Sequence, residues 1–361
     1  MKERRAQMLL FEGSVGLGSQ YRLNKGSRQQ VAGTGSSSIQ MWVPLPIPYS
    51  NAQCVSYKDE ILICGGYKTR RVTPTTSGLK STKRYCENEG EDGVTLLSFG
   101  GSGWMRRHVL LMHYESIWNE LQLAPTTSTT STTATNEQEQ TPKYKKKRKN
   151  QWIKMDSMKM FAKEHDNWIG ARALIGGKRR DLLFLTYFPD NIDVLNLNTY
   201  QRIRSDTLPI NAEDHSISYH CFVPLKTNEF ILIAYGVNLL IKYNESQNHF
   251  TFESLPLCPP LRPEGRGGLR NGDYGHAYIN GHILLFGGPF VAIQSFNTTL
   301  LSWTRFQDSL PIALSGCTGV ITQQGRCLHI ISGKNDSFRE LTAHFVIKDK
   351  RLIGVMCPCC V

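Results

Sequence analysis

The chain has 361 residues, and its hydrophobic content of 40% is enough for a sizeable folded core. Its net charge of +12 is unevenly placed: residues 1 to 40 and residues 125 to 150 each carry six lysines and arginines against two glutamates. The folded body is therefore only mildly basic, which argues against a nucleic-acid partner.

No segment reaches the roughly 18 apolar residues that a membrane span requires. The apolar run at the N-terminus, Met8 to Phe11, is too short for a secretory signal. The ten cysteines are scattered, and several lie inside apolar, strand-like runs, which fits a reducing compartment better than a disulfide framework. We therefore expect a protein of the cytoplasm or the nucleus without a membrane contact. We also expect it to be a monomer.

The first part of the chain, residues 1–39, is polar and rich in glycine and serine, so we expect a disordered tail. The next segment, Met41 to Pro46 with Trp42, resembles the end of a repeated unit, because Trp303 is likewise followed by Leu310-Pro311. A last strand that precedes any first strand would complete the final sheet of a ring, and we expect it to close the ring there.

Six apolar runs, read as second strands, then follow at regular intervals. They are Glu60 to Tyr67, Val94 to Gly101, Asp181 to Tyr187, Glu229 to Gly236, His282 to Gly288 and Cys327 to Gly333. First strands are expected at Ala52 to Tyr57, Gly170 to Ile175, Ile217 to Pro224, Tyr274 to Ile279 and Gly316 to Thr322. Third strands are expected at His108 to Tyr114, Ile192 to Leu197, Leu239 to Tyr243, Val291 to Phe296 and Leu341 to Lys348.

The most complete unit spans Tyr274 to Pro311: an apolar run, the pair Gly287-Gly288, another strand, a turn and Trp303. This arrangement resembles a kelch repeat, one blade of a β-propeller. The resemblance covers residues 40–350 and implies an all-β, six-bladed kelch-type propeller closed by an N-terminal strand. The repeat positions it identifies are Gly65, Gly66, Gly100, Gly101, Gly287, Gly288, Trp303 and Trp42.

Two parts of the chain depart from this pattern. Only 35 residues separate Gly66 from Gly101, so the first blade is either abbreviated or has lost part of its sequence. Residues 122–150 form a low-complexity basic insertion, expected to be a solvated loop. Its run Lys145, Lys146, Lys147, Arg148 and Lys149 is typical of a nuclear import signal or of lysine-rich filler. Residues 351–361 are expected to be a flexible tail.

No catalytic or metal-binding constellation is apparent. The cysteines at the C-terminus lack a second ligand pair, the histidines lack metal-ligand spacing, and the acidic residues are spread over different units. No phosphate-binding loop follows a strand. We therefore expect neither a metal nor a cofactor.

Arginines and aromatic residues gather in the connections between second and third strands and between consecutive units. These connections share one face of a propeller, and arginine binds carboxylates bidentately. The residues are Arg70, Arg71, Trp104, Arg106, Arg107, Arg262, Arg266, Arg270, Phe290 and Arg339.

A surface of this kind suits a protein or acidic peptide partner, and an incidentally basic, solvated rim is the other interpretation. We expect a non-enzymatic interaction scaffold. The alternative is an enzyme that acts on a sugar or a small metabolite at the mouth of the central channel.

Overall fold

The computed structural model describes the chain in segments, and all the regular structure in them is β-strand, without a helix. The described residues are 9–11, 19–22, 39–57, 60–64, 94–102, 107–116, 150–154, 163, 165–211, 216–258, 274–288, 290–306, 309–322 and 327–348. Within them no helix is long and apolar enough to cross a membrane.

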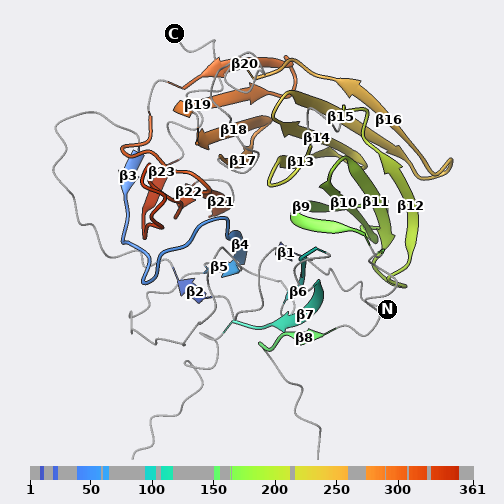
Figure 1. Ribbon diagram of the computed structural model, residues 1–361, viewed down its shortest axis with the longest axis horizontal. Coiled ribbons are helices and arrows are strands. Elements are labelled where there is room, and N and C mark those ends of the chain that lie inside the picture. The colour runs from blue at the N-terminus through green and yellow to red at the C-terminus, as the bar shows by residue number, and fades with distance from the viewer. Residues whose placement is uncertain are drawn as a thin grey trace, which may run out of the picture.

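The strands form six sheets arranged as a ring around a common centre (Figure 1). We number the sheets in chain order around the ring. Sheet 1 contains β4 (Gln53–Tyr57), β5 (Glu60–Cys64) and β2 (Ser19–Arg22). Sheet 2 contains β1 (Leu9–Phe11), β6 (Val94–Gly100), β7 (His108–Tyr114) and β8 (Ile153–Lys154).

The next two sheets are formed by consecutive antiparallel strands. Sheet 3 contains β9 (Asn167–Gly176), β10 (Leu182–Phe188), β11 (Asn191–Asn196) and β12 (Arg202–Thr207). Sheet 4 contains β13 (Cys221–Lys226), β14 (Glu229–Ala234), β15 (Val237–Asn244) and β16 (His249–Ser254).

The last two sheets complete the circle. Sheet 5 contains β17 (Gly275–Ile279), β18 (His282–Gly287), β19 (Phe290–Asn297) and β20 (Ser302–Arg305). Sheet 6 contains β21 (Thr318–Thr322), β22 (Cys327–Ile331), β23 (His344–Lys348) and β3 (Ile39–Met41).

The core lies between the sheets rather than inside any of them. Each pair of neighbouring sheets shares one apolar cluster: Phe184 meets Phe230 between sheets 3 and 4, for example, and Phe286 meets Phe345 between sheets 5 and 6. A sheet whose two faces are both buried in this way needs a neighbour on each side. The molecule is therefore a β-propeller, as the repeated apolar runs predicted.

The sequence predicts six blades, each a sheet of four strands. Of the six sheets in the structure, five have four strands each, and sheet 1 has three. Of its three strands, only β4 and β5 come from the segment expected to form it, and β2 is added from the N-terminal region. The described residues therefore contain five complete blades, and the first is shortened, as the close spacing of Gly66 and Gly101 suggested.

The expectation of a disordered tail over residues 1–39 does not hold for β1 and β2. β1 lies parallel to β6 in sheet 2, and β2 lies antiparallel to β5 in sheet 1. β1 is thus an edge strand of sheet 2 and β2 an edge strand of sheet 1, and these two sheets flank the short stretch between β5 and β6. Because unpaired edge groups of β5 and β6 would be costly, chain from elsewhere supplies the missing partners.

The predicted ring closure is confirmed. β3 pairs with β23 in the register Ile39↔Ile347, Gln40↔Val346 and Met41↔Phe345. Beyond β3, the Trp42 amide donates to the carbonyl of His344 at 2.8 Å. The first described strand after the N-terminal region thus completes the last sheet, so the two ends of the ring are held by backbone hydrogen bonds.

Gly287 and Trp303 of sheet 5 each lie against a neighbouring part of the ring. Gly287 has a φ of 73°, and a Cβ there would lie 2.5 Å from the carbonyl oxygen of Leu314 in the next connection. The Trp303 indole donates from Nε1 to the carbonyl of Pro256, at the end of sheet 4, at 2.8 Å. Both features join neighbouring sheets. Gly65 and Gly66 lie outside the described residues.

A buried histidine pair lies beside the closure. His329 Nδ1 and His344 Nε2 are 2.8 Å apart, and His344 Nδ1 is 3.2 Å from the carbonyl oxygen of Val43. His344 Nδ1 must donate to that carbonyl, so its Nε2 accepts from His329. Burial lowers the pKa of His329 to about 3, helped by His344, and lowers the pKa of His344 to about 4. The pair is neutral in the folded protein.

The pair predicts a loss of stability in acid. The unfolded histidines have pKa values near 6.5, so below about pH 6.5 the unfolded state takes up protons that the folded state does not. Each buried histidine then lowers the free energy of unfolding by up to about 1.4 kcal/mol per pH unit down to its folded pKa. In urea titrations between pH 7 and pH 4, His329→Leu is expected to flatten this dependence, and His249→Leu, at an exposed position, should leave it unchanged. An unaltered slope in His329→Leu would contradict the assignment.

Candidate functional site

Two faces of the ring are distinguished by their connections. Connections from second to third strands, and from one sheet to the next, share the face that we call the loop face. Ser315, between β20 and β21, exchanges backbone hydrogen bonds with Lys334, between β22 and β23. The remaining hairpin turns share the opposite face, where Gly177, after β9, donates to Asn228, after β13, at 2.6 Å. We call it the hairpin face.

Most residues predicted to bind a partner lie outside the described residues, as do residues 117–149, which contain most of the basic insertion, and residues 351–361. These predictions remain untested. The predicted partner-binding residues concerned are Arg70, Arg71, Trp104, Arg106, Arg262, Arg266 and Arg270, and those of the predicted import signal are Lys145, Lys146, Lys147, Arg148 and Lys149.

Phe290 does not fit the surface role predicted for it. It is 6% exposed, and its ring centroid lies 5.8 Å from that of Tyr274, also of sheet 5, in an edge-to-face contact. Both rings belong to the apolar cluster that sheet 5 shares with sheet 4. Phe290 follows the glycine pair at the first position of β19, and there the strand already turns its side chain into the core. It stabilises the fold and is not accessible to a partner.

Arg107 and Arg339 are the predicted arginines that the structure describes. Arg107 is half-buried and donates from Nη1 to the carbonyl of Lys163. Arg339 is exposed, in the connection between β22 and β23. Of these two arginines, Arg339 is the one whose side chain is exposed on the loop face.

The connection that carries Arg339 is an ordered loop. The Asn335 side-chain oxygen accepts from the amides of Ser337 at 3.1 Å and Arg339 at 3.0 Å. The Asn335 amide donates to the carbonyl of Arg339 at 3.0 Å, and the Phe338 amide donates to the carbonyl of Asn335 at 2.8 Å. An asparagine that satisfies several backbone amides fixes a turn without needing glycine. We call residues 334–341 the Asn335 loop.

Neighbouring connections hold this loop from both sides. On one side Ser315 pairs with Lys334, and on the other the Ser50 hydroxyl donates to Glu340 Oε1 at 2.9 Å. The Asn51 amide in turn donates to the carbonyl of Gly316 at 2.8 Å. Three segments, residues 49–51, 314–316 and 332–341, thereby form one hydrogen-bonded platform on the loop face, at the junction of sheets 5, 6 and 1.

Phe338 projects from this platform and is 83% exposed. It was not among the residues predicted from the sequence. Its signal in the sequence is an aromatic residue inside a polar loop that begins with the turn-forming pair Asn335-Asp336.

A second group of polar residues lies on the innermost strands. The Arg172 guanidinium donates from Nε to the carbonyl of His220 at 3.0 Å, and it lies 5.9 Å from the ring centroid of Tyr219. Burial, and then the charge of Arg172, lower the pKa of His276 to about 3 and that of His220 well below its usual range. His220 is fully buried, and Arg172 and His276 are partly exposed.

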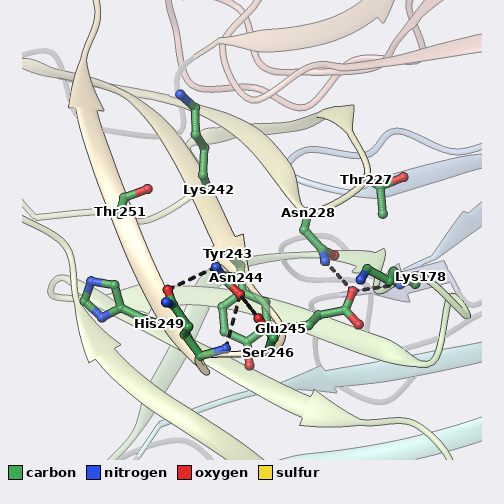
Figure 2. Close-up of a pocket in the computed structure, with 11 residues that line it drawn as sticks. Lys178, Thr227, Asn228, Lys242, Tyr243, Asn244, Glu245, Ser246, His249 and Thr251 are labelled. Carbon is green, nitrogen blue, oxygen red and sulfur yellow. Dashed lines mark hydrogen bonds between the residues drawn. The ribbon is translucent and has the colours of Figure 1, made fainter.

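The hairpin face has a hollow of about 490 Å³ on sheet 4 (Figure 2). Several of its polar groups bind one another. Glu245 accepts from the Asn228 side-chain amide and from the backbone amide of Lys178 at 2.8 Å, and so joins sheet 4 to sheet 3. The Asn244 side-chain oxygen accepts from the amide of Ser246 at 3.0 Å. Groups committed to holding turns in place are poorly suited to recognise a ligand.

In the described part of the chain, no group of three or more His, Cys, Asp or Glu side chains is placed to hold a metal ion. None of the six cysteines described there forms a disulfide bond. Burial raises the pKa of the Cys317 thiol to about 12, and it raises that of Cys64 and Cys221 further. These thiols are therefore unreactive core residues.

The known proteins to which this chain is similar are solved structures of low sequence identity. No protein-family model and no curated protein matches the chain. Among solved structures, it is similar to that titled "Structure of YjhT", with 12% identity and a TM-score of 0.48 over 83% of this chain and 95% of that one. It is also similar to the Cps50 (Swd1) β-propeller domain of Myceliophteria thermophila, with 12% identity and a TM-score of 0.29 over 46% of this chain and 56% of that one.

Proposed function

We propose that this chain is a kelch-type propeller that acts as a non-enzymatic scaffold and holds a protein or acidic peptide partner on its loop face. The observation that carries the proposal is the platform of residues 49–51, 314–316 and 332–341, which joins connections from three sheets by hydrogen bonds. A preorganised surface lowers the entropic cost of binding. We further propose that it works as a monomer in a reducing compartment, the cytoplasm or the nucleus.

The contrast between the faces supports this choice. The hollow on the hairpin face uses its carboxylate and amide groups to hold its own turns. On the loop face, Ile312, Phe338 and Arg339 are exposed. Aromatic and arginine side chains are enriched at protein interfaces. The large apolar side chains described as exposed on the hairpin face, Leu300 and Leu301, are aliphatic, whereas Phe338 of the loop face is aromatic and adjoins Arg339.

The test compares two double variants that make matched changes on opposite faces. Ile312→Glu with Arg339→Glu alters the loop face, and Leu300→Glu with Arg179→Glu alters exposed positions of the hairpin face. In quantitative affinity capture from extracts, the loop-face variant is expected to lose specific partners at least about tenfold, because buried charge opposes docking. Equal recovery by both variants, or a loss confined to the hairpin-face variant, would refute the proposal.

The alternative function is an enzyme acting on a sugar or a small metabolite at the centre of the ring. Arg172 and His276, partly exposed on the innermost strands, are the residues that would serve it. Such a ligand would raise the melting temperature of the intact protein, and Arg172→Ala would abolish the shift. We favour the scaffold because His220, the third member of this group, is fully buried and cannot contact a ligand.

A further inference from the structure

The exposure of Phe338 has no counterpart among the other large apolar side chains described. Its 83% compares with 67% for Leu300 and 54% for Ile153, the next most exposed. A phenylalanine gains more free energy from burial than nearly any other side chain. Fixing it in water at the tip of an ordered loop contributes nothing to the stability of this fold.

The backbone at Phe338 adds a second cost. Its φ is 57°, in the left-handed region that a bulky side chain rarely occupies. Asparagine or glycine would meet the same turn geometry more easily. A conformation that is unfavourable for the residue present, at a position where that residue makes no core contact, points to a role outside folding.

The loop holds this conformation without help from the phenylalanine ring. Asn335 binds the backbone on both sides of Phe338 through its side-chain oxygen and its amide, and Lys334 and Glu340 are anchored to neighbouring connections. The ring therefore projects from a fixed base. A preorganised aromatic side chain of this kind is typical of the anchor residue of an interface.

Charged residues of opposite sign flank the ring. Asp336 and Arg339 are both exposed, two residues before Phe338 and one after it. A complementary surface would offer an apolar pocket for the ring, with a basic group on the side of Asp336 and an acidic group on the side of Arg339.

We propose that the Asn335 loop is inserted into a partner: Phe338 is the knob, and the partner is a folded protein domain with an apolar pocket whose rim carries one basic and one acidic side chain. This inference rests on the proposed scaffold function and deepens it. In this mode of binding, the propeller inserts a side chain into a pocket of its partner. In a peptide-binding groove, the partner would instead insert into the propeller.

The first test asks whether Phe338 contributes to the stability of the fold. Phe338→Gly is expected to raise the folding equilibrium constant about two- to fivefold in urea titrations, since it relieves the left-handed strain and removes no core contact. Leu301→Gly is the matched control, because Leu301 has a φ of 50°, is 41% exposed and lies on the hairpin face. A large destabilisation by Phe338→Gly would show that the ring supports the fold, and would overturn the proposal.

The second test uses the full-length protein with a photo-crosslinking phenylalanine analogue at position 338 or, as control, at position 301. In extract, position 338 is expected to form a discrete protein adduct, and position 301 is not. Excess unlabelled wild-type protein and Leu301→Gly should suppress the adduct at least about tenfold, and Phe338→Gly should not. Phe338→Asn, which keeps the turn preference without the ring, should behave like Phe338→Gly.

The outcomes distinguish this proposal from the broader one. Suppose that Phe338→Gly suppresses the adduct as well as wild type does, while the double variant Ile312→Glu with Arg339→Glu does not. The role proposed for Phe338 is then wrong, and the scaffold function stands. If the loop-face double variant competes equally well, both fail. The absence of an adduct at position 338, or adducts at both positions, would also overturn the knob.

Discussion

Replacing Ile39 with aspartate is expected to open the ring. Ile39 is 6% exposed and lies in the closing strand β3, where it pairs with Ile347 of β23. Its side chain belongs, with Phe345, to the apolar cluster between sheets 5 and 6. The change removes a buried aliphatic side chain and places an unpaired carboxylate in its position. Together these should lower the free energy of unfolding by about 4 kcal/mol or more, measured by urea denaturation.

Gln40→Asp is the matched control for this change. Gln40 is the next residue of β3, and its side chain is exposed. The same carboxylate there should change the free energy of unfolding by no more than about 0.5 kcal/mol. If Ile39→Asp were as mild as Gln40→Asp, β3 would not be needed to hold the ring closed.

Replacing Arg202 with methionine is expected to have the second-largest effect. Arg202 is 14% exposed, and its Nη1 and Nη2 lie 3.1 Å from Asp193 and 3.2 Å from Asp166. The Tyr187 hydroxyl also donates to Asp193 at 2.9 Å. Without the guanidinium, two buried carboxylates lose their counter-charge, which should cost about 3 to 5 kcal/mol at pH 7.

The pH dependence gives this prediction a distinctive sign. Burial already raises the pKa of Asp193, despite the opposing effects of Ser205 and Arg202. Removing Arg202 raises it further, so the folded variant binds protons more readily than its unfolded chain. The deficit relative to wild type should therefore shrink as pH falls from 7 to 5 in urea titrations. A constant or growing deficit would show that packing, and not charge, is what Arg202 supplies.

Arg204→Met is the corresponding control. Arg204 pairs with Asp206 at 2.8 Å on the same strand, but the two side chains are 38% and 27% exposed. Water screens such a pair, and its loss is expected to cost less than about 1 kcal/mol, with little change between pH 7 and pH 5.

The strands were predictable because the signal for each is local. The segments Ile283 to Phe286 and Phe230 to Ala234, for example, are continuously apolar, since second strands are buried on both faces, and turns bound them in the sequence. The closing role of Trp42 followed from counting strands within each unit. The last sheet lacks a fourth strand of its own, so the remaining place for β3 is beside β23.

The candidate site was far less predictable. Phe290 lies at the start of β19 and Phe338 in the Asn335 loop, and both belong to segments that the repeat pattern places on the loop face. Phe290 is 6% exposed and Phe338 is 83% exposed. The difference depends on where Tyr274 of sheet 5 lies in one case, and on how segments 49–51 and 314–316 hold the Asn335 loop in the other.

The sequence by itself determined the all-β class, the six apolar second strands and the closure of the ring, because alternation and glycine pairs act over a few residues. Only the tertiary structure decided that β1 joins sheet 2, that β2 joins sheet 1, and that Phe338 faces solvent. Strand pairing and exposure depend on residues far apart in the chain, so they are properties of the assembled ring.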